Sequence, residues 1–152
     1  MKKTALVTGS NKGIGFAIVR GLARTGMSVW MGARDRSRGE EAVAILRQEG
    51  LDVRLLELDV ADEASVQNAA AVLAHALGSL DVLVNNAGIL SDTITPPSQV
   101  SIKDMKAVYE VNLFGPVRVT QAFLSLLKAS GEARIVMMSS GVGSLTLITD
   151  PT

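Results

Sequence analysis

The sequence predicts an α/β protein built on a doubly wound parallel sheet, and three observations lead to this prediction. Short apolar runs alternate with amphipathic stretches along almost the whole chain. The connections between them are short, as in parallel strands joined by right-handed helical crossovers. The 152 residues suffice for one domain, residues 1–152, whose core must be aliphatic because aromatic residues make up only 3%.

Five apolar runs have the length and near-continuous hydrophobicity of buried parallel strands. They cover residues 4–8, 28–32, 53–58, 81–84 and 134–138. The strict alternation of strand and helix predicts the strand order 3-2-1-4-5, which is the Rossmann-type arrangement ended after its fifth strand.

The first two helices are expected over residues 13–24 and 36–49, and Gly50 ends the second. In the first, the i, i+4, i+8 spacing predicts a buried face. That face consists of Ile14, Ile18 and Leu22. The buried side predicted for the second helix consists of Ala42, Ile45, Leu46 and Glu49.

A third helix is expected to begin at residues 62–63, where two acids suit the positive helix end, and to stop at Gly78. Its apolar stripe consists of Val66, Ala69, Ala70, Leu73 and Leu77. Pro96 and Pro97 indicate a loop. Residues 101–114 and 116–129 are then expected to form two helices that meet at Gly115–Pro116.

A glycine-rich turn lies between the first strand and the first helix, and it is the first candidate site. A pyrophosphate needs close backbone approach, free N–H groups and the positive end of a helix, and glycines leave room for it. The alternative is that these glycines serve only the geometry of the turn, but the strand–turn–helix context favours a bound nucleotide. The predicted binding residues are Gly9, Ser10, Asn11, Lys12, Gly13, Ile14 and Gly15.

The turn reads T-G-x-x-x-G-x-G from Thr8 to Gly15, and further motifs follow in order: Asp59–Val60, Asn85-Asn86-Ala87-Gly88, Asn112 and Ser139–Ser140. Together they resemble the short-chain dehydrogenase/reductase family. The resemblance implies that Asp59 and Val60 contact adenine and that Asn86, Ala87 and Gly88 belong to the cofactor site. It also implies catalytic roles for Asn112 and Ser140, with Ser139 as the alternative substrate serine.

The end of the second strand bears on the choice of nicotinamide cofactor. An acid there would bond a ribose 2′-OH, whereas this chain has Ala33 followed by Arg34, whose guanidinium matches a 2′-phosphate. Lys12 is a second candidate cation, and the alternative for both is a solvated surface charge. Asp35 lies one residue too late and is expected to point elsewhere. We therefore expect NADP(H).

The segment 9–20 together with Ala33–Asp35 is especially similar to carbonyl reductases of the family, which implies reduction of a ketone, aldehyde or quinone. In the family a tyrosine donates the proton and a lysine four residues later lowers its pKa. The only tyrosine here is Tyr109, and Leu113 stands four residues on. We expect the chain alone to be inactive: a fragment of the enzyme, a non-catalytic NADP(H)-binding module, or a subunit that another chain completes.

The charge and cysteine content indicate which kinds of ligand and partner to expect. Fifteen basic and fifteen acidic residues give a net charge of +0, which does not favour nucleic acid or a membrane surface. Cysteine is absent and no cluster has metal-ligand spacing, so we expect no metal site. The apolar run at the amino end breaks at Gly9, too early for a signal peptide, and polar residues interrupt the apolar stretch 69–84, so we expect a cytoplasmic location. The fifth strand would be an apolar edge, through which we expect self-association.

Overall fold

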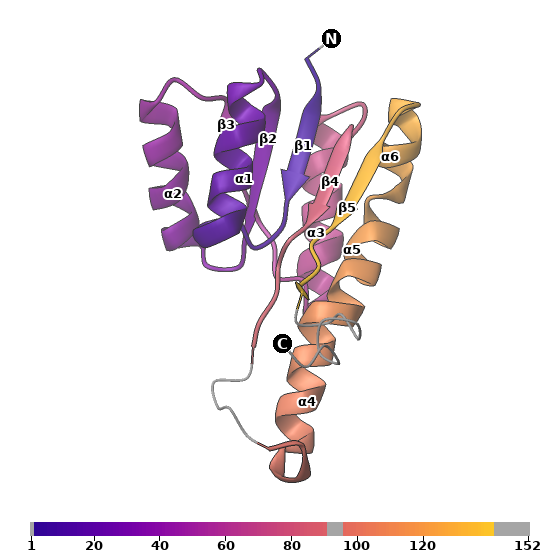
Figure 1. Cartoon of the computed structure of the whole chain (residues 1–152). Helices are drawn as coiled ribbons and strands as arrows, with labels where there is room; N and C mark the ends of the chain where they lie inside the picture. The colour runs from indigo at the N-terminus through magenta and orange to yellow at the C-terminus, as the bar shows by residue number, and fades with distance from the viewer. Residues whose placement is uncertain (1, 91–95, 142–152) are drawn as a thin grey trace.

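The computed structural model describes residues 2–90 and 96–141, which form a five-stranded parallel sheet with helices on both faces (Figure 1). The strands are β1 (Thr4–Val7), β2 (Ser28–Ala33), β3 (Val53–Glu57), β4 (Val82–Asn85) and β5 (Arg134–Met137). Their order is β3-β2-β1-β4-β5, and every neighbouring pair is parallel, so the predicted topology is confirmed.

Successive residues of a strand point to opposite faces, so each strand feeds two cores. On one face Ala5, Val7 and Met31 pack with α1 (Gly13–Arg24) and α2 (Arg36–Gln48). On the other face Leu6 and Leu83 pack with α3 (Glu63–Ala76) and with the helices that follow β4. Both β1 and β4 are therefore buried on each side, and their carboxyl ends are held rigidly.

The prediction for α3 is confirmed. Val66, Ala69, Ala70 and Leu73 are buried and Leu77 packs against them. Asp62 begins the helix by accepting hydrogen bonds from the backbone N–H groups of Ala64 (2.9 Å) and Ser65 (3.4 Å).

The faces predicted for α1 and α2 are only partly right. Ile14 and Ile45 are exposed by 67% and 50%, and the buried residues of the two helices include Gly15 and Gly39 instead. A Cβ on Gly15 would lie 2.5 Å from Nδ2 of Asn86, and one on Gly39 would lie 2.4 Å from Cδ1 of Leu55. Helices α1 and α2 thus make close contacts through glycines. Glycines do not contribute to a hydrophobic pattern, so periodicity could not reveal these contacts.

A helix begins at Gly115, as predicted, but it continues directly from the helical turns before it, so one long helical segment runs through Gly115–Pro116 (Figure 1). After the short 3-10 turn η1 (Pro97–Gln99), this segment consists of α4 (Ile102–Tyr109), the π-helical turn η2 (Glu110–Phe114) and α5 (Gly115–Ala122). Pro116 has no N–H to donate, and the turn before it widens so that the N–H of Gly115 bonds the carbonyl of Glu110. The chain bends at Phe123 and continues as α6 (Leu124–Ser130).

Asp81 fastens the amino end of the sheet. Its carboxylate accepts hydrogen bonds from the backbone N–H of Thr4 (2.7 Å) and from the hydroxyl of Ser130 at the end of α6 (2.7 Å). Partial burial raises the pKa of Asp81, but these hydrogen bonds outweigh it and hold the pKa below its usual range. The carboxylate thereby joins β1, β4 and α6.

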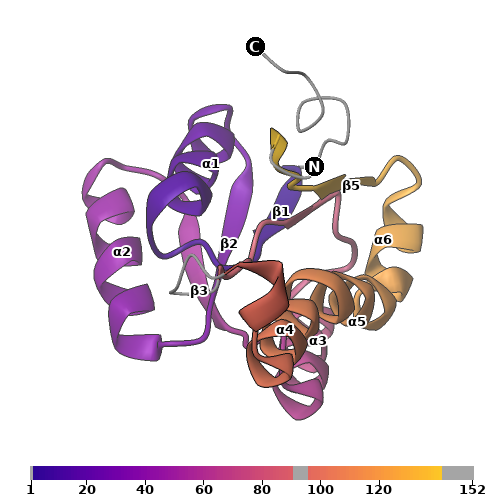
Figure 2. The same cartoon turned by 60° about the horizontal axis from the view of Figure 1, so that its bottom comes forward.

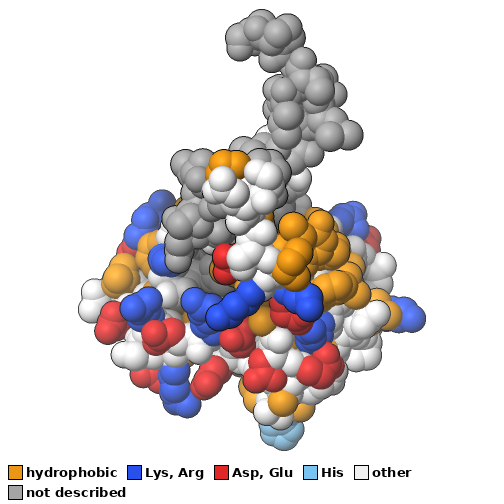
Figure 3. Space-filling view, turned by 90° about the horizontal axis from the view of Figure 1, so that it is seen from below, with side chains coloured by type: hydrophobic (Ala, Val, Ile, Leu, Met, Phe, Trp, Pro, Cys, Tyr) orange, Lys and Arg blue, Asp and Glu red, His pale blue; other side chains and the backbone are white. Residues whose placement is uncertain are grey.

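Strand β5 is an edge of the described sheet, and its side chains, like that of Met138 after it, are exposed. Apolar side chains of α4 are exposed as well, and α4 extends past the carboxyl ends of the strands (Figure 1). Seen from that end, basic and acidic side chains are interspersed and hydrophobic ones gather to one side (Figure 3). Among the described helices, none is both long and apolar enough to cross a membrane.

Candidate functional site

The candidate site lies at the carboxyl ends of β1 and β4, where the glycine turn meets the loop that follows β4 (Figure 2). Gly9 has φ +59°, a conformation that side chains rarely adopt, and a Cβ there would lie 2.7 Å from Cα of Ala87. Gly13 also has a positive φ and opens onto free space. The glycines thus bring two loops together and leave the start of α1 bare.

Thr8 joins these two loops, and the sequence analysis did not count it among the site residues. Its Oγ1 accepts hydrogen bonds from the backbone N–H groups of Asn86 and Ala87, both at 3.0 Å. In the opposite direction, the side-chain Nδ2 of Asn86 donates hydrogen bonds to the carbonyls of Thr8 (2.9 Å) and Gly9 (3.1 Å). The threonine that opens the T-G-x-x-x-G-x-G pattern was the available signal.

A hollow of about 400 Å³ opens between these loops. The predicted residues that line it are Gly9, Asn11, Lys12, Gly13, Ile14, Gly15, Arg34, Asp59, Val60, Asn86, Ala87 and Gly88. Leu58, Ile89 and Val111 complete the wall and were not predicted. Residues from five separate segments of the sequence therefore meet around one cavity.

Ser10 differs from the other residues predicted for the glycine turn. Its side chain is fully buried, and its hydroxyl donates to the carbonyl of Val7 at 2.7 Å. Its backbone N–H bonds the carbonyl of Gly32 at 2.9 Å. These two donors hold the turn against β1 and β2, and Ser10 does not line the hollow.

Two cations line the hollow. Arg34 and Lys12 are both exposed and both line it, beside the positive end of α1. Asp35 points away, as predicted, because its carboxylate accepts a hydrogen bond from the N–H of Arg38 (3.0 Å) and begins α2. Arg38 shares a neighbouring hollow with Lys12, and it is a further cation that the sequence analysis missed.

Asn112 lies in the π-helical turn η2 and holds the loop after Gly88. Its Oδ1 accepts from the N–H of Ile89 at 2.9 Å, and its Nδ2 donates to the carbonyl of the same residue at 2.8 Å. The side chain of Asn112 is thus occupied by the protein.

Ser139 and Ser140 follow β5 at the same end of the sheet, where the N–H of Met138 bonds the carbonyl of Asn85 at 3.0 Å. Both are exposed, and neither lines the 400 Å³ hollow. Tyr109 lies in α4 on the exposed apolar face and not in the hollow.

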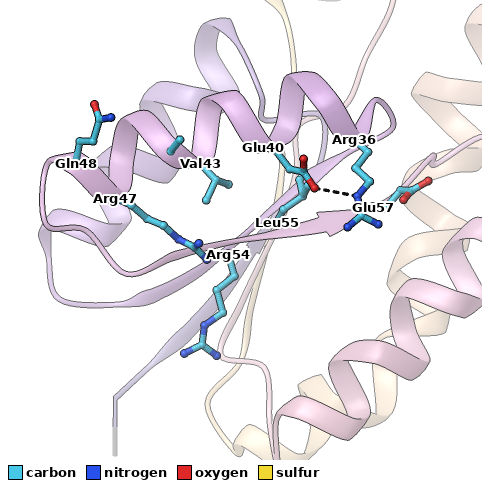
Figure 4. Close-up of a pocket in the computed structure, with 9 residues that line it drawn as sticks. Arg36, Glu40, Val43, Arg47, Gln48, Arg54, Leu55 and Glu57 are labelled. Atoms are coloured by element: carbon cyan, nitrogen blue, oxygen red, sulfur yellow. Dashed lines mark hydrogen bonds and ion pairs between the residues drawn. The ribbon is translucent and has the colours of Figure 1, made fainter.

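A larger hollow of about 730 Å³ lies between α2 and β3 (Figure 4). Arg36 and Glu40 form an ion pair there at 2.9 Å, and Nε of Arg47 donates to the carbonyl of Val53 at 2.8 Å. None of the predicted residues lines it. We therefore place the site at the smaller hollow, where the glycine turn and the cations meet. In residues 2–90 and 96–141 no group of acidic or histidine side chains could hold a metal ion.

Comparison with known proteins agrees with this geometry. A family model described as short chain dehydrogenase matches residues 3–151. The chain is 41% identical to (+)-neomenthol dehydrogenase of Arabidopsis thaliana and 42% identical to carbonyl reductase [NADPH] 1 of Rattus norvegicus, in each case over 93% of the chain. It covers 54% and 50% of those proteins, so it spans about half of their length.

Among solved structures, NADPH-bound carbonyl reductase from chicken fatty liver superposes with a TM-score of 0.87 at 31% identity. The match covers 97% of this chain and 63% of that one. The fold, the glycine turn and these relatives lead to one conclusion: the chain belongs to the short-chain dehydrogenase family.

Proposed function

We propose that this chain forms the NADP(H)-binding part of an oxidoreductase that reduces the carbonyl group of a ketone, aldehyde or quinone. The observation that carries the proposal is the placing of Arg34 and Lys12 at a hollow that begins at the bare amino end of α1. A helix amino end suits a pyrophosphate, and a guanidinium beside it suits an additional phosphate. Relatives named for NADPH support the same cofactor.

The residues present fit such a cofactor. Gly9, Gly13 and Gly15 leave the turn free of side chains, and Asp59–Val60 with Leu58 form the wall on the side of β3. Bound NADPH would supply the hydride. Ser140, or Ser139, would donate a hydrogen bond to the carbonyl oxygen of the substrate, and the Asn112 side chain would hold the loop at Ile89 against it. The absence of cysteine supports a reducing, cytoplasmic compartment.

Replacing Arg34 with aspartate should reverse the choice of cofactor. NADPH should bind the unaltered chain more tightly than NADH, and Arg34→Asp should lose about ten- to a hundredfold in NADPH affinity, because a charged hydrogen bond contributes roughly 1.5–3 kcal/mol. Isothermal titration with both cofactors measures this. Arg36→Asp is the matched control, since it makes the same charge change two residues on, outside this hollow. Equal affinities of the unaltered chain for NADPH and NADH would refute the proposal.

We also propose self-association through the outer edge of β5. Ile135, Val136, Met137 and Met138 are all exposed there, and an apolar strand edge readily pairs with another chain. We expect light scattering to show species larger than the monomer, and Val136→Lys to reduce them. Val72→Lys places the same change on an exposed position of α3 and serves as control. A monomeric peak from the unaltered chain at all concentrations would contradict this proposal.

A further inference from the structure

Arg118 of α5 contacts three different segments, and none of its partners is on its own helix α5. Its Nη1 donates to the backbone carbonyl of Val60 at 2.5 Å. Its Nη2 donates to the carboxylate of Glu110 in η2 at 2.5 Å, and its Nε to that of Glu63 in the first turn of α3 at 2.9 Å. The side chain is 18% exposed. A planar guanidinium can satisfy three such acceptors at once, which an ammonium on a flexible stem cannot do in the same geometry.

The bond to Val60 matters because Val60 forms part of the wall of the nucleotide hollow. Arg118 itself does not line that hollow. It holds Val60 from behind, through the carbonyl, while the side chain of Val60 packs against Gly115. A Cβ on Gly115 would lie 2.9 Å from Cγ2 of Val60, so helix α5 is already as close as it can come.

The neighbouring residue Asp59 is held by the same segment. Its N–H donates to the hydroxyl of Ser65 and its Oδ1 accepts from the N–H of Ala61, both at 2.9 Å. Glu63 and Ser65 belong to the first turn of α3, so Arg118 and Ser65 fix the two ends of one short connection between β3 and α3. That connection forms part of the wall of the hollow that the glycine turn also lines.

Through Glu110, Arg118 also contacts the π-helical turn η2. Glu110 lies in η2 beside Val111, which lines the hollow, and two residues before Asn112, which holds Ile89. The hydrogen bond that Arg118 donates to Glu110 raises the pKa of Arg118, so the guanidinium stays charged at every pH at which the fold exists. A permanent cation therefore joins the β3–α3 connection to the π-helical turn.

We propose that Arg118 is a positioning residue for the adenosine half of the cofactor, and that it acts through the carbonyl of Val60. The inference rests on the proposed NADP(H) function. It assigns cofactor affinity to a side chain outside the cofactor hollow, on a helix that the sequence motifs do not include.

The test uses two ligands and three variants of the whole chain. Adenosine 2′,5′-bisphosphate represents the adenosine half, and NADPH represents the whole cofactor. In Arg118→Met both affinities should fall by the same factor, about tenfold, because the loss is confined to the half that the ligands share. Arg118→Lys should bind with intermediate affinity. Arg20→Met removes an arginine whose ion pair with Glu49 (2.7 Å) lies outside the hollow, and it should bind both ligands like the unaltered chain.

The outcomes separate the inference from the function. If the unaltered chain binds neither ligand, the proposed function fails and the inference with it. If the unaltered chain binds both and Arg118→Met binds them equally well, the inference is wrong and the function stands. A loss for NADPH without a loss for the bisphosphate also overturns it. If circular dichroism shows that Arg118→Met does not fold, Arg118→Lys decides, and unaltered affinity in that variant overturns the proposal.

Discussion

Given NADPH and a quinone, the 152 residues alone should oxidise the nucleotide about 10²–10⁴-fold more slowly than the same residues extended by a family segment that carries Tyr-x-x-x-Lys. Hydride transfer to a carbonyl leaves an alkoxide that needs a proton, and a positioned acid contributes a factor of that size. Ser140 can donate a hydrogen bond, but its hydroxyl is a poor acid at neutral pH. The missing lysine should also weaken the placement of the nicotinamide, and the two losses need not add.

The assay follows NADPH oxidation with a panel of quinones, aldehydes and ketones. The control is the affinity for adenosine 2′,5′-bisphosphate, which should be similar in the two forms because the residues assigned to the adenosine half all lie within 1–152. In the extended form, Ser140→Ala and Ser139→Ala show which serine meets the substrate. Similar turnover by both forms would mean that the chemistry belongs to residues already present, and Tyr109 would then have to be reconsidered.

The largest effect on stability is expected at Thr8. Replacing it with valine keeps the shape of the side chain but removes the oxygen that accepts from the N–H groups of Asn86 and Ala87. Each donor left without an acceptor costs about 1–3 kcal/mol, so the free energy of unfolding should fall by roughly 2–6 kcal/mol. That is a large share of the ~5–15 kcal/mol that holds a domain folded.

Thr8→Ser retains the hydroxyl and is the matched control. Urea unfolding followed by circular dichroism should place Thr8→Ser near the unaltered chain and Thr8→Val far below it. If Thr8→Val unfolds at the same urea concentration as the unaltered chain, the hydroxyl does not govern stability, and the joining role assigned to Thr8 would be wrong.

Topology and cavity were both predictable from the sequence for a simple reason. Parallel strands that are buried on both faces appear in the sequence as continuous apolar runs. The loops that follow such strands all lie at the same edge of the sheet. The glycine turn and the loop at Asn86 were therefore bound to converge, and they do. The buried face of α3 could also be predicted, because its contact residues are apolar side chains that recur at helical spacing.

Other features depend on contacts between distant residues, which periodicity does not encode. Ile14 and Ile45 were misassigned because glycines, not isoleucines, form the close contacts of α1 and α2. Ser10 has the right place in the motif, but its hydroxyl is taken by the carbonyl of Val7. Arg118 is an ordinary helical arginine in the sequence, and only the fold brings it to Val60.

The π-helical turn also sets the rotational phase of the long helix. One extra residue within a turn shifts everything on one side of it by about 100° around the helix axis relative to the other side. Without that shift, α5 could not direct Gly115 and Arg118 to Val60 while Asn112 faces Ile89. A deletion of one residue between Glu110 and Phe114 would thus rotate α5 relative to α4 around the helix axis. It would separate the two walls of the hollow without altering any residue that lines it except Val111.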